Sequence, residues 1–265
     1  MSDLIIAIVL GIIEGLTEFL PVSSTAHQIL AADLLGFRVA GWDAFVVMIQ
    51  LGAILAIVVL YFSKLWNVLV TLPSERRSQL FAAGIIVAFL PAVALGVLFH
   101  SQIKELLFAP LPIAIALIAG GIVIIVVERN LPRVKFTESD TLPLSVCLKI
   151  GVLQCLAMIP GTSRSGATIV GALLLGVERR AAAEFSFFLA IPTMLGAFVY
   201  DLYKNWSIFT PDTALLIGVG SFAAFIAAML VVRWALGFIA RHGFTPFAWY
   251  RIALGSLILV ALAVR

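Results

Sequence analysis

Six long apolar stretches constrain this chain more than any other feature. A helix needs about 20 mostly apolar residues to cross a bilayer, and residues 44–62, 80–99, 111–127, 184–200, 213–232 and 247–264 each come near that length. Only 12% of the 265 residues are charged, which leaves too little polar surface for a water-soluble globule. The sequence therefore predicts an all-α polytopic membrane protein. Arg251 lies near one end of the last stretch, where we expect its side chain to snorkel to water.

The plan of the chain repeats in its two halves. Residues 11–16 (GIIEGL) resemble 151–156 (GVLQCL), and each stretch leads to a proline and then a hydroxyl-rich turn. A short helix is predicted after each turn, at 25–35 and 165–175, and neither is long enough to cross the membrane. We predict one membrane domain, 1–265, made of repeat one (about 1–130) and repeat two (about 141–265). Each half is a re-entrant helical hairpin plus three transmembrane helices.

Three crossings per half is an odd number, so the second half should enter the membrane from the opposite side. Such inverted-topology repeats place their sites near the midplane, at broken helices. One set of loops holds ten basic residues, namely Lys64, Arg76, Arg77, Arg129, Arg133, Lys135, Arg179, Arg180, Arg233 and Arg241. The other set holds four, namely Arg38, Lys104, Lys204 and Arg265. The positive-inside rule makes the first set cytoplasmic, and the first hairpin then opens to the outside.

Two carboxylates stand in the first apolar helix. Glu14 and Glu18 have the spacing i, i+4, so they share one helix face. An ionised carboxylate is costly there, and a bound cation or an arginine would offset that cost. If they instead faced water at the mouth of the hairpin, no partner would be required. We expect both to hold a cation, Mg²⁺ or Ca²⁺, or one of them to act as a base, and we count Glu18 among the catalytic residues as well as the metal ligands.

The first turn carries Ser23, Ser24 and Thr25, closely followed by His27. One hydroxyl is enough to cap a helix, whereas several hydroxyls at a helix N-terminus suit a phosphate group. Ser24 and His27 have the spacing i, i+3 and can share a face. This spacing suits a hydroxyl nucleophile beside a base, or a histidine that protonates a leaving oxygen. A packed histidine without a chemical role is the alternative.

The second turn carries Arg164 between Ser163 and Ser165, with Thr168 one helical turn later. A guanidinium can hold two phosphate oxygens at once, which a lysine cannot. The alternative is a capped turn with a snorkelling arginine. Gln50 is a polar residue inside a span and is expected to line the cavity. Together these groups predict phosphoryl chemistry on a lipid, with Ser23, Thr25, Ser163, Ser165 and Thr168 as phosphate ligands.

Two other classes of function compete with an enzyme. A transporter or flippase of a phosphate-bearing lipid would also use inverted repeats and broken helices, but anion transport does not require two acids beside the anion. A structural membrane subunit would not need ionisable residues concentrated in two matched turns. Nucleic acid is not expected as a partner, because the basic residues lie in short loops between spans.

Two segments, EGLTEFLPVSSTAH at 14–27 and PGTSRSGAT at 160–168, resemble the signature motifs of the undecaprenyl-diphosphatase family, the bacterial bacitracin-resistance phosphatases. The resemblance covers essentially the whole chain. It implies hydrolysis of undecaprenyl diphosphate to undecaprenyl phosphate and phosphate, with Mg²⁺ or Ca²⁺. It also implies recycling of the carrier lipid for peptidoglycan, resistance to bacitracin, and a site in the bacterial inner membrane that opens to the periplasmic face.

By motif position, the resemblance assigns chemistry to Glu14, Glu18, Ser24, His27 and Arg164, and a phosphate-binding shell to Ser23, Ser163, Ser165 and Thr168. Two mechanisms stay open at this point. In the first mechanism, Ser24 attacks phosphorus with help from His27. In the second, a metal-activated water attacks while His27 protonates the leaving oxygen. The oligomeric state stays open too, with a homodimer among the arrangements.

Overall fold

The computed structural model describes residues 2–264 except 38–41, 108–109, 205 and 207–209. Helices make up all the regular structure in these ranges, apart from an isolated bridge between Phe136 and Val177. The first half contains α1 (Asp3–Thr17), α2 (Ser24–Leu35), α3 (Trp42–Leu60), α4 (Phe62–Thr71), α5 (Arg76–Leu107) and α6 (Pro110–Arg129). The second contains α7 (Leu144–Gln154), η1 (Cys155–Met158), α8 (Arg164–Leu174), α9 (Arg179–Lys204), α10 (Pro211–His242) and α11 (Thr245–Val264).

All six predicted spans appear as helices. Five of them are long and apolar enough to cross a membrane: α5, α6, α9, α10 and α11. The sixth is α3, which bends by 71° into the short helix α4. The prediction of an all-α polytopic membrane protein is confirmed.

The two predicted hairpins are α1–α2 and α7–η1–α8, and their turns share an unusual backbone. Ser23 and Ser163, which occupy equivalent positions of the two repeats, cap α2 and α8 with φ angles of 70° and 76°. They are the two residues other than glycine with positive φ in the described part of the chain. A serine in the left-handed region is strained. The same strained geometry at equivalent places supports the predicted repeat.

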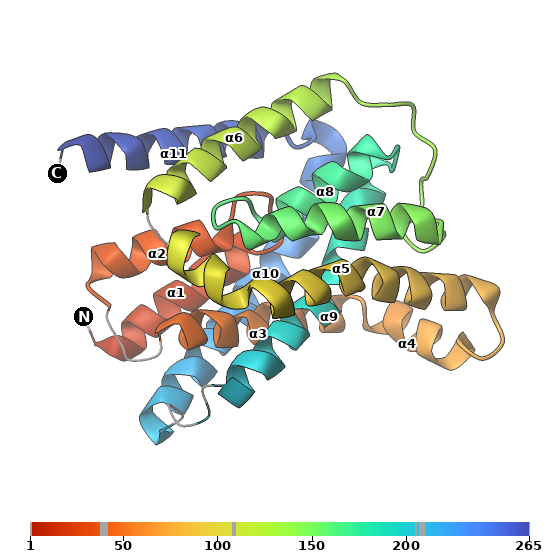
Figure 1. The fold of residues 1–265 in the computed structure, drawn as a ribbon. Helices are drawn as coiled ribbons and strands as arrows, with labels where there is room; N and C mark the ends of the chain where they lie inside the picture. Colours follow the sequence, from red (N-terminus) through yellow and green to blue (C-terminus); the bar gives the residue numbers. More distant parts are fainter. Residues whose placement is uncertain (1, 38–41, 108–109, 205, 207–209, 265) are drawn as a thin grey trace.

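Packing pairs also correspond between the halves. Helix α1 packs on α10 as α7 packs on α5, and α3 packs on α10 as α9 packs on α5. In Figure 1 the hairpin α1–α2 opens to the left, where α11 also ends, and α7–α8 opens to the right. Opposite entry of the hairpins is what an inverted repeat predicts. The inversion of the complete halves stays a prediction. Of the four basic residues assigned to the outer loops, Arg38, Arg265 and the side chain of Lys104 lie outside the described residues.

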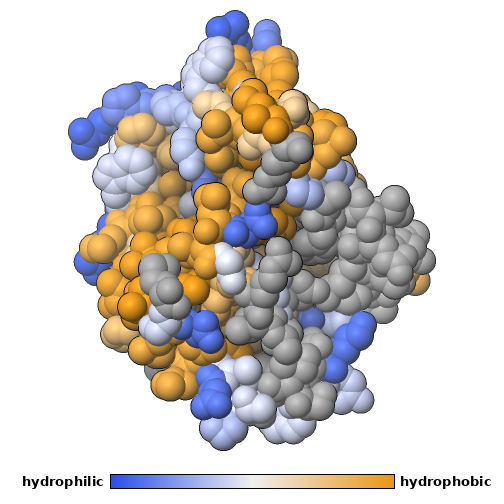
Figure 2. Space-filling model, turned by 90° about the vertical axis from the view of Figure 1, so that its left-hand side faces the viewer, coloured by the Kyte–Doolittle hydropathy of each residue, from blue (hydrophilic) through white to orange (hydrophobic). Residues whose placement is uncertain are grey.

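The outer surface is largely apolar. Many large side chains on the spanning helices are exposed, among them Leu90, Ile115, Val199 and Leu230. Figure 2, which views the molecule from the left side of Figure 1, shows hydrophobic residues over much of the described surface. Exposed apolar area on this scale fits contact with lipid tails rather than with water.

The segment between the two halves is tied down by ion pairs. Arg77 bonds Glu138 at 2.6 Å and Asp140 at 2.9 Å, and Lys64 lies 3.8 Å from Asp140. Partial burial alone would raise the pKa of Asp140, but the hydrogen bonds and charge of Arg77 and the charge of Lys64 outweigh it, so the pKa lies below its ordinary value. These residues belong to the loops predicted to be cytoplasmic, so the network joins the two halves on that side.

Candidate active site

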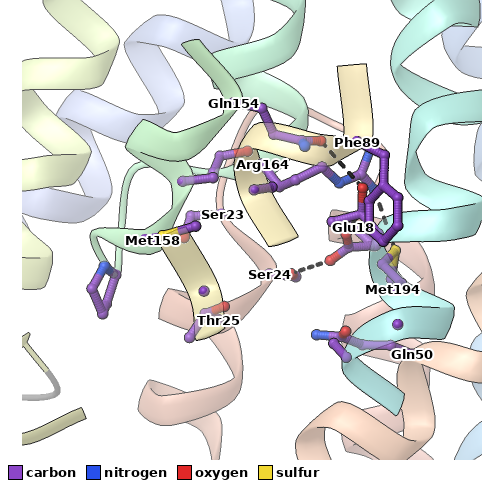
Figure 3. Close-up of a pocket in the computed structure, with 18 of the residues that line it drawn as sticks. Glu18, Ser23, Ser24, Thr25, Gln50, Phe89, Gln154, Met158, Arg164 and Met194 are labelled. Carbon is purple, nitrogen blue, oxygen red and sulfur yellow. Dashed lines mark hydrogen bonds and ion pairs between the residues drawn. The ribbon is translucent and has the colours of Figure 1, made fainter. Parts of the chain in front are cut away.

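A cavity of about 470 Å³ lies where the two hairpin turns meet. Its polar wall comes from both halves of the chain and contains Glu18, Ser23, Ser24, Thr25, Gln50, Gln154, Ser163, Arg164, Thr193 and Asp201. Its apolar wall contains Phe89, Val93, Gly96, Ala157, Met158, Met194, Gly196 and Tyr200. In Figure 3, Gln154 and Arg164 lie at the upper edge and Gln50 at the lower edge, with Glu18 and Ser24 between them. The two polar turns thus meet inside the membrane domain.

A chain of three side chains joins the hairpins inside this cavity. Ser24 donates a hydrogen bond from Oγ to Oε2 of Glu18, and Arg164 donates from Nη2 to Oε1 of the same carboxylate at 2.9 Å. Glu18 is 7% exposed and Ser24 also 7%, so water screens these contacts little. A hydroxyl, a carboxylate that can take its proton, and a cation that orients the carboxylate form the arrangement of an activated nucleophile.

Arg164 is held by a second group of contacts on α9. Its Nη1 donates to the carbonyl oxygen of Ser186 at 2.9 Å, and its Nη2 lies 3.4 Å from the sulfur of Met194. The Nε–H has no partner. The guanidinium is therefore fixed in place by protein groups, and one of its donors is buried without a partner.

The hydroxyls of the second turn mostly bond protein groups. Ser163 caps α8 by accepting from the N–H of Gly166 at 3.1 Å, and Ser165 donates to the carbonyl of Leu20 in the first hairpin at 2.7 Å. Thr168 and Ser186 share a 2.6 Å bond between their hydroxyls. Ser165 and Thr168 thus support the turn and Arg164 from behind, and neither is on the cavity wall.

Glu14 lies deeper, behind the cavity. Its side chain is 0% exposed, and Oε2 accepts a 3.2 Å bond from Gln28, which also donates to the carbonyl of Leu10 at 2.8 Å. Oε1 of Glu14 and Oε1 of Gln28 are both buried without a partner. Both unpartnered atoms are oxygen acceptors, the type of ligand that a hard cation prefers.

His27 is engaged on both ring nitrogens, away from Ser24. Nδ1 lies 2.7 Å from the carbonyl oxygen of Ser23, which only an N–H can satisfy, so Nε2 accepts from the hydroxyl of Tyr250 at 2.6 Å. The two rings also stack with centroids 5.5 Å apart. His27 therefore supports the first turn and is not among the residues that line the cavity.

The position of the Arg251 side chain differs from the one predicted from the sequence. Its side chain is 1% exposed and does not snorkel. It donates five hydrogen bonds to backbone carbonyls: Pro21 in the first turn, Gly161 and Thr162 in the second, and Ala116 and Leu117 in α6. The nearby Gly120 leaves room for it, since a Cβ there would lie 2.1 Å from Nη2. A fork of five N–H groups can satisfy so many acceptors at once, so the buried charge ties both turns together.

Substitution of Arg251 by methionine is expected to lower the stability of the protein by about 3 kcal/mol, because several buried carbonyls lose their donor. The turnover number should also fall about tenfold, because the turns carry the two halves of the polar wall. Thermal unfolding and turnover in detergent check both effects. Arg233→Met, at an exposed position of α10, is the control and should change neither. Equal stability of Arg251→Met and the parent protein would contradict this role.

Of the predicted site residues, the cavity wall brings together Glu18, Ser23, Ser24, Thr25, Gln50, Ser163 and Arg164. Glu14, His27, Ser165 and Thr168 stand behind it. Further polar residues now belong to the site and were not predicted, among them Gln28, Gln154, Thr193, Asp201 and Arg251. The repeat offered a signal for one of them, because Gln154 is the counterpart of Glu14 when 151–156 is aligned with 11–16.

Comparison with known proteins identifies the family. The model of a family described as bacitracin resistance protein BacA matches residues 7–257. The chain belongs to the BacA family. Undecaprenyl-diphosphatase 1 of Agrobacterium fabrum is 55% identical over 264 residues, which are 99% of this chain and 98% of that protein. An undecaprenyl-diphosphatase of Cereibacter sphaeroides is 54% identical over 98% of this chain and 97% of its own length.

A third relative in the BacA comparison is undecaprenyl-diphosphatase 2 of Paramagnetospirillum magneticum, with 51% identity over 98% of this chain and 99% of the relative. The family match spans both hairpins and all the helices around the cavity. The resemblance inferred from the two motifs is confirmed.

Proposed function

We propose that this chain is an integral membrane phosphatase that hydrolyses undecaprenyl diphosphate to undecaprenyl phosphate and inorganic phosphate. Membership of the BacA family supports the substrate. The structural observation that carries the proposal is the Ser24–Glu18–Arg164 arrangement in a cavity between the hairpins. The activity would recycle the carrier lipid for cell-wall synthesis and confer bacitracin resistance.

The geometry favours Ser24 as the nucleophile and Glu18 as its base. Ser24 bonds Glu18 rather than His27, whose nitrogens are both engaged elsewhere. Ser24 Oγ forms a bond to the terminal phosphorus while Glu18 takes its proton, and the bond from that phosphorus to the bridging oxygen breaks. Undecaprenyl phosphate leaves as a stable anion, and water then hydrolyses the phosphoserine. Arg164 stabilises the charge on the phosphoryl oxygens.

A divalent cation fits the residues behind the nucleophile. Glu14 and Gln28 each present a buried oxygen without a partner, next to Glu18. No group of three or more histidine, cysteine or acidic side chains that could hold a metal occurs in the described ranges, so the substrate and water would have to complete the shell, as is common for Mg²⁺. When bound, Mg²⁺ or Ca²⁺ would neutralise phosphate charge that the glutamates otherwise repel.

The apolar wall suits the hydrocarbon tail. Phe89 and Val93 of α5 and Met158 of η1 belong to this wall. A cavity of about 470 Å³ holds the diphosphate and the start of a long polyprenyl chain, so the rest of the tail would lie among the membrane lipids. This division explains why the site is built within the membrane domain.

The location and orientation form part of the proposal. Membership of the BacA family supports insertion in the bacterial inner membrane. The ten-to-four distribution of basic residues between the two sets of loops supports an orientation with the first hairpin open to the periplasmic face. Association as a homodimer stays a prediction from the sequence.

The deciding experiment is phosphate release from undecaprenyl diphosphate by purified protein, with and without EDTA. We expect release that EDTA abolishes and that added Mg²⁺ or Ca²⁺ restores. Release that persists in EDTA would contradict the cation while leaving the phosphatase intact. Well-folded protein that releases no phosphate with the ion supplied would contradict the enzyme and favour transport of the lipid.

A further inference from the structure

One side-chain amide on the cavity wall is buried without a hydrogen-bond partner for its N–H group. A bound ligand could supply that partner. Gln154, the last residue of α7, is 2% exposed, and its Nε2 has no hydrogen-bond partner. Its Oε1 receives only a long 3.5 Å contact from Thr193, whose hydroxyl also donates to Leu189 at 2.8 Å. A buried donor without an acceptor is destabilising and therefore uncommon in native proteins.

The type of ligand follows from the polarity of the unpartnered atoms. On the second hairpin these atoms are both donors, Nε2 of Gln154 and Nε of Arg164. On the first hairpin they are both acceptors, Oε1 of Glu14 and Oε1 of Gln28. Two buried donors, one of them on a cation, favour an anion on the second-hairpin side of the cavity.

The repeat explains how this asymmetry arises. Gln154 stands at the same place in its hairpin as Glu14 does in the first, and Ser163 corresponds to Ser23 in the same way. The same backbone position thus presents an acid in one half and an amide in the other. An amide offers a donor without the negative charge that would repel a phosphate group.

We propose that Gln154 is a substrate-binding residue that donates a hydrogen bond from its amide to a phosphate oxygen of the diphosphate, together with Nε of Arg164. The proposal rests on the proposed phosphatase function, since it names a contact for the substrate of that reaction. It predicts that the amide acts mainly on binding, because Ser24 and Glu18 carry the bond-breaking step.

The test compares Gln154→Met, which keeps the side-chain length and removes the donor, with Gln154→Glu, which replaces the amide nitrogen by a charged oxygen. For Gln154→Met, the KM for undecaprenyl diphosphate and the inhibition constant of inorganic phosphate should rise about tenfold, with kcat within threefold of the parent value. Gln154→Glu should weaken both by more than 100-fold. Gln79→Met, at an exposed position of α5, is the control and should change neither.

Thermal stabilisation by inorganic phosphate gives a readout that needs no turnover. Phosphate should raise the unfolding temperature of the parent protein and of Gln79→Met, and this shift should shrink in both Gln154 variants. Variants that bind phosphate as the parent does would overturn the proposal. So would a Gln154→Glu variant that binds as well or better, because the amide oxygen would then face the ligand. If the parent binds phosphate without hydrolysing the lipid, the function fails while this measurement still decides the role of Gln154.

Discussion

Replacement of Ser24 by alanine is expected to lower kcat for undecaprenyl diphosphate at least about 1,000-fold, as loss of an attacking side chain does in other hydrolases. The reason is the direct bond from Ser24 to Glu18, which makes this hydroxyl the group poised to attack. Rates of phosphate release by purified protein measure the effect. Acid-quenched turnover of the parent protein should also trap phosphate on Ser24, detectable by mass spectrometry.

The same variant decides between the two mechanisms that the sequence leaves open. If water is the attacking group, Ser24→Ala removes only a hydrogen bond to Glu18, and kcat should fall no more than about tenfold. Such a small loss, without a trapped phosphoserine, would refute the serine nucleophile. Ser256→Ala, an exposed serine of α11, serves as the control and should match the parent protein.

The second large effect is expected at Arg164. Substitution by lysine keeps the charge but cannot contact Glu18, Ser186 and a phosphate oxygen at once, as the guanidinium can. We expect kcat/KM to fall by about 100- to 1,000-fold, the usual cost of removing one group that stabilises transition-state charge. Steady-state kinetics with undecaprenyl diphosphate measure the change.

The control for Arg164→Lys is Arg180→Lys, which makes the same chemical change at an exposed arginine that pairs with Glu184. Exposed pairs contribute little, so this variant should keep kcat/KM within about twofold of the parent value. An Arg164→Lys variant with near-normal kcat/KM would mean that the second hairpin does not hold the reacting phosphate.

Much of the fold could be predicted because a membrane protein signals its spans by length and apolarity alone. The six spans and both short helices follow from the sequence. The boundaries differ by one residue at α8, where 165–175 is expected and Arg164–Leu174 is found, and by up to ten at α10, where 213–232 is expected and Pro211–His242 is found. The bend of 71° between α3 and α4 could not be predicted, because residues 60–62 contain neither glycine nor proline.

The candidate site was predictable where polar residues clustered at the turns, and not where contacts cross between distant helices. Glu18, Ser24 and Arg164 stood out as polar groups in apolar surroundings. The pairing of His27 with Tyr250, 223 positions away, left no local signal. The prediction that Arg251 snorkels to water was wrong. Its position near the helix end favoured that prediction, whereas its guanidinium bonds backbone carbonyl groups of three other segments.

The contacts of Arg251 also have a consequence for how the protein is made. The carbonyls it satisfies belong to the first turn, the second turn and α6, yet the arginine itself arrives with α11, the last helix of the chain. A ribosome therefore delivers both hairpins to the membrane well before the residue that holds their turns together. The nascent chain therefore contains all the cavity-wall residues before the arginine that joins their turns is made, so we expect the two turns to reach their final packing only when α11 inserts.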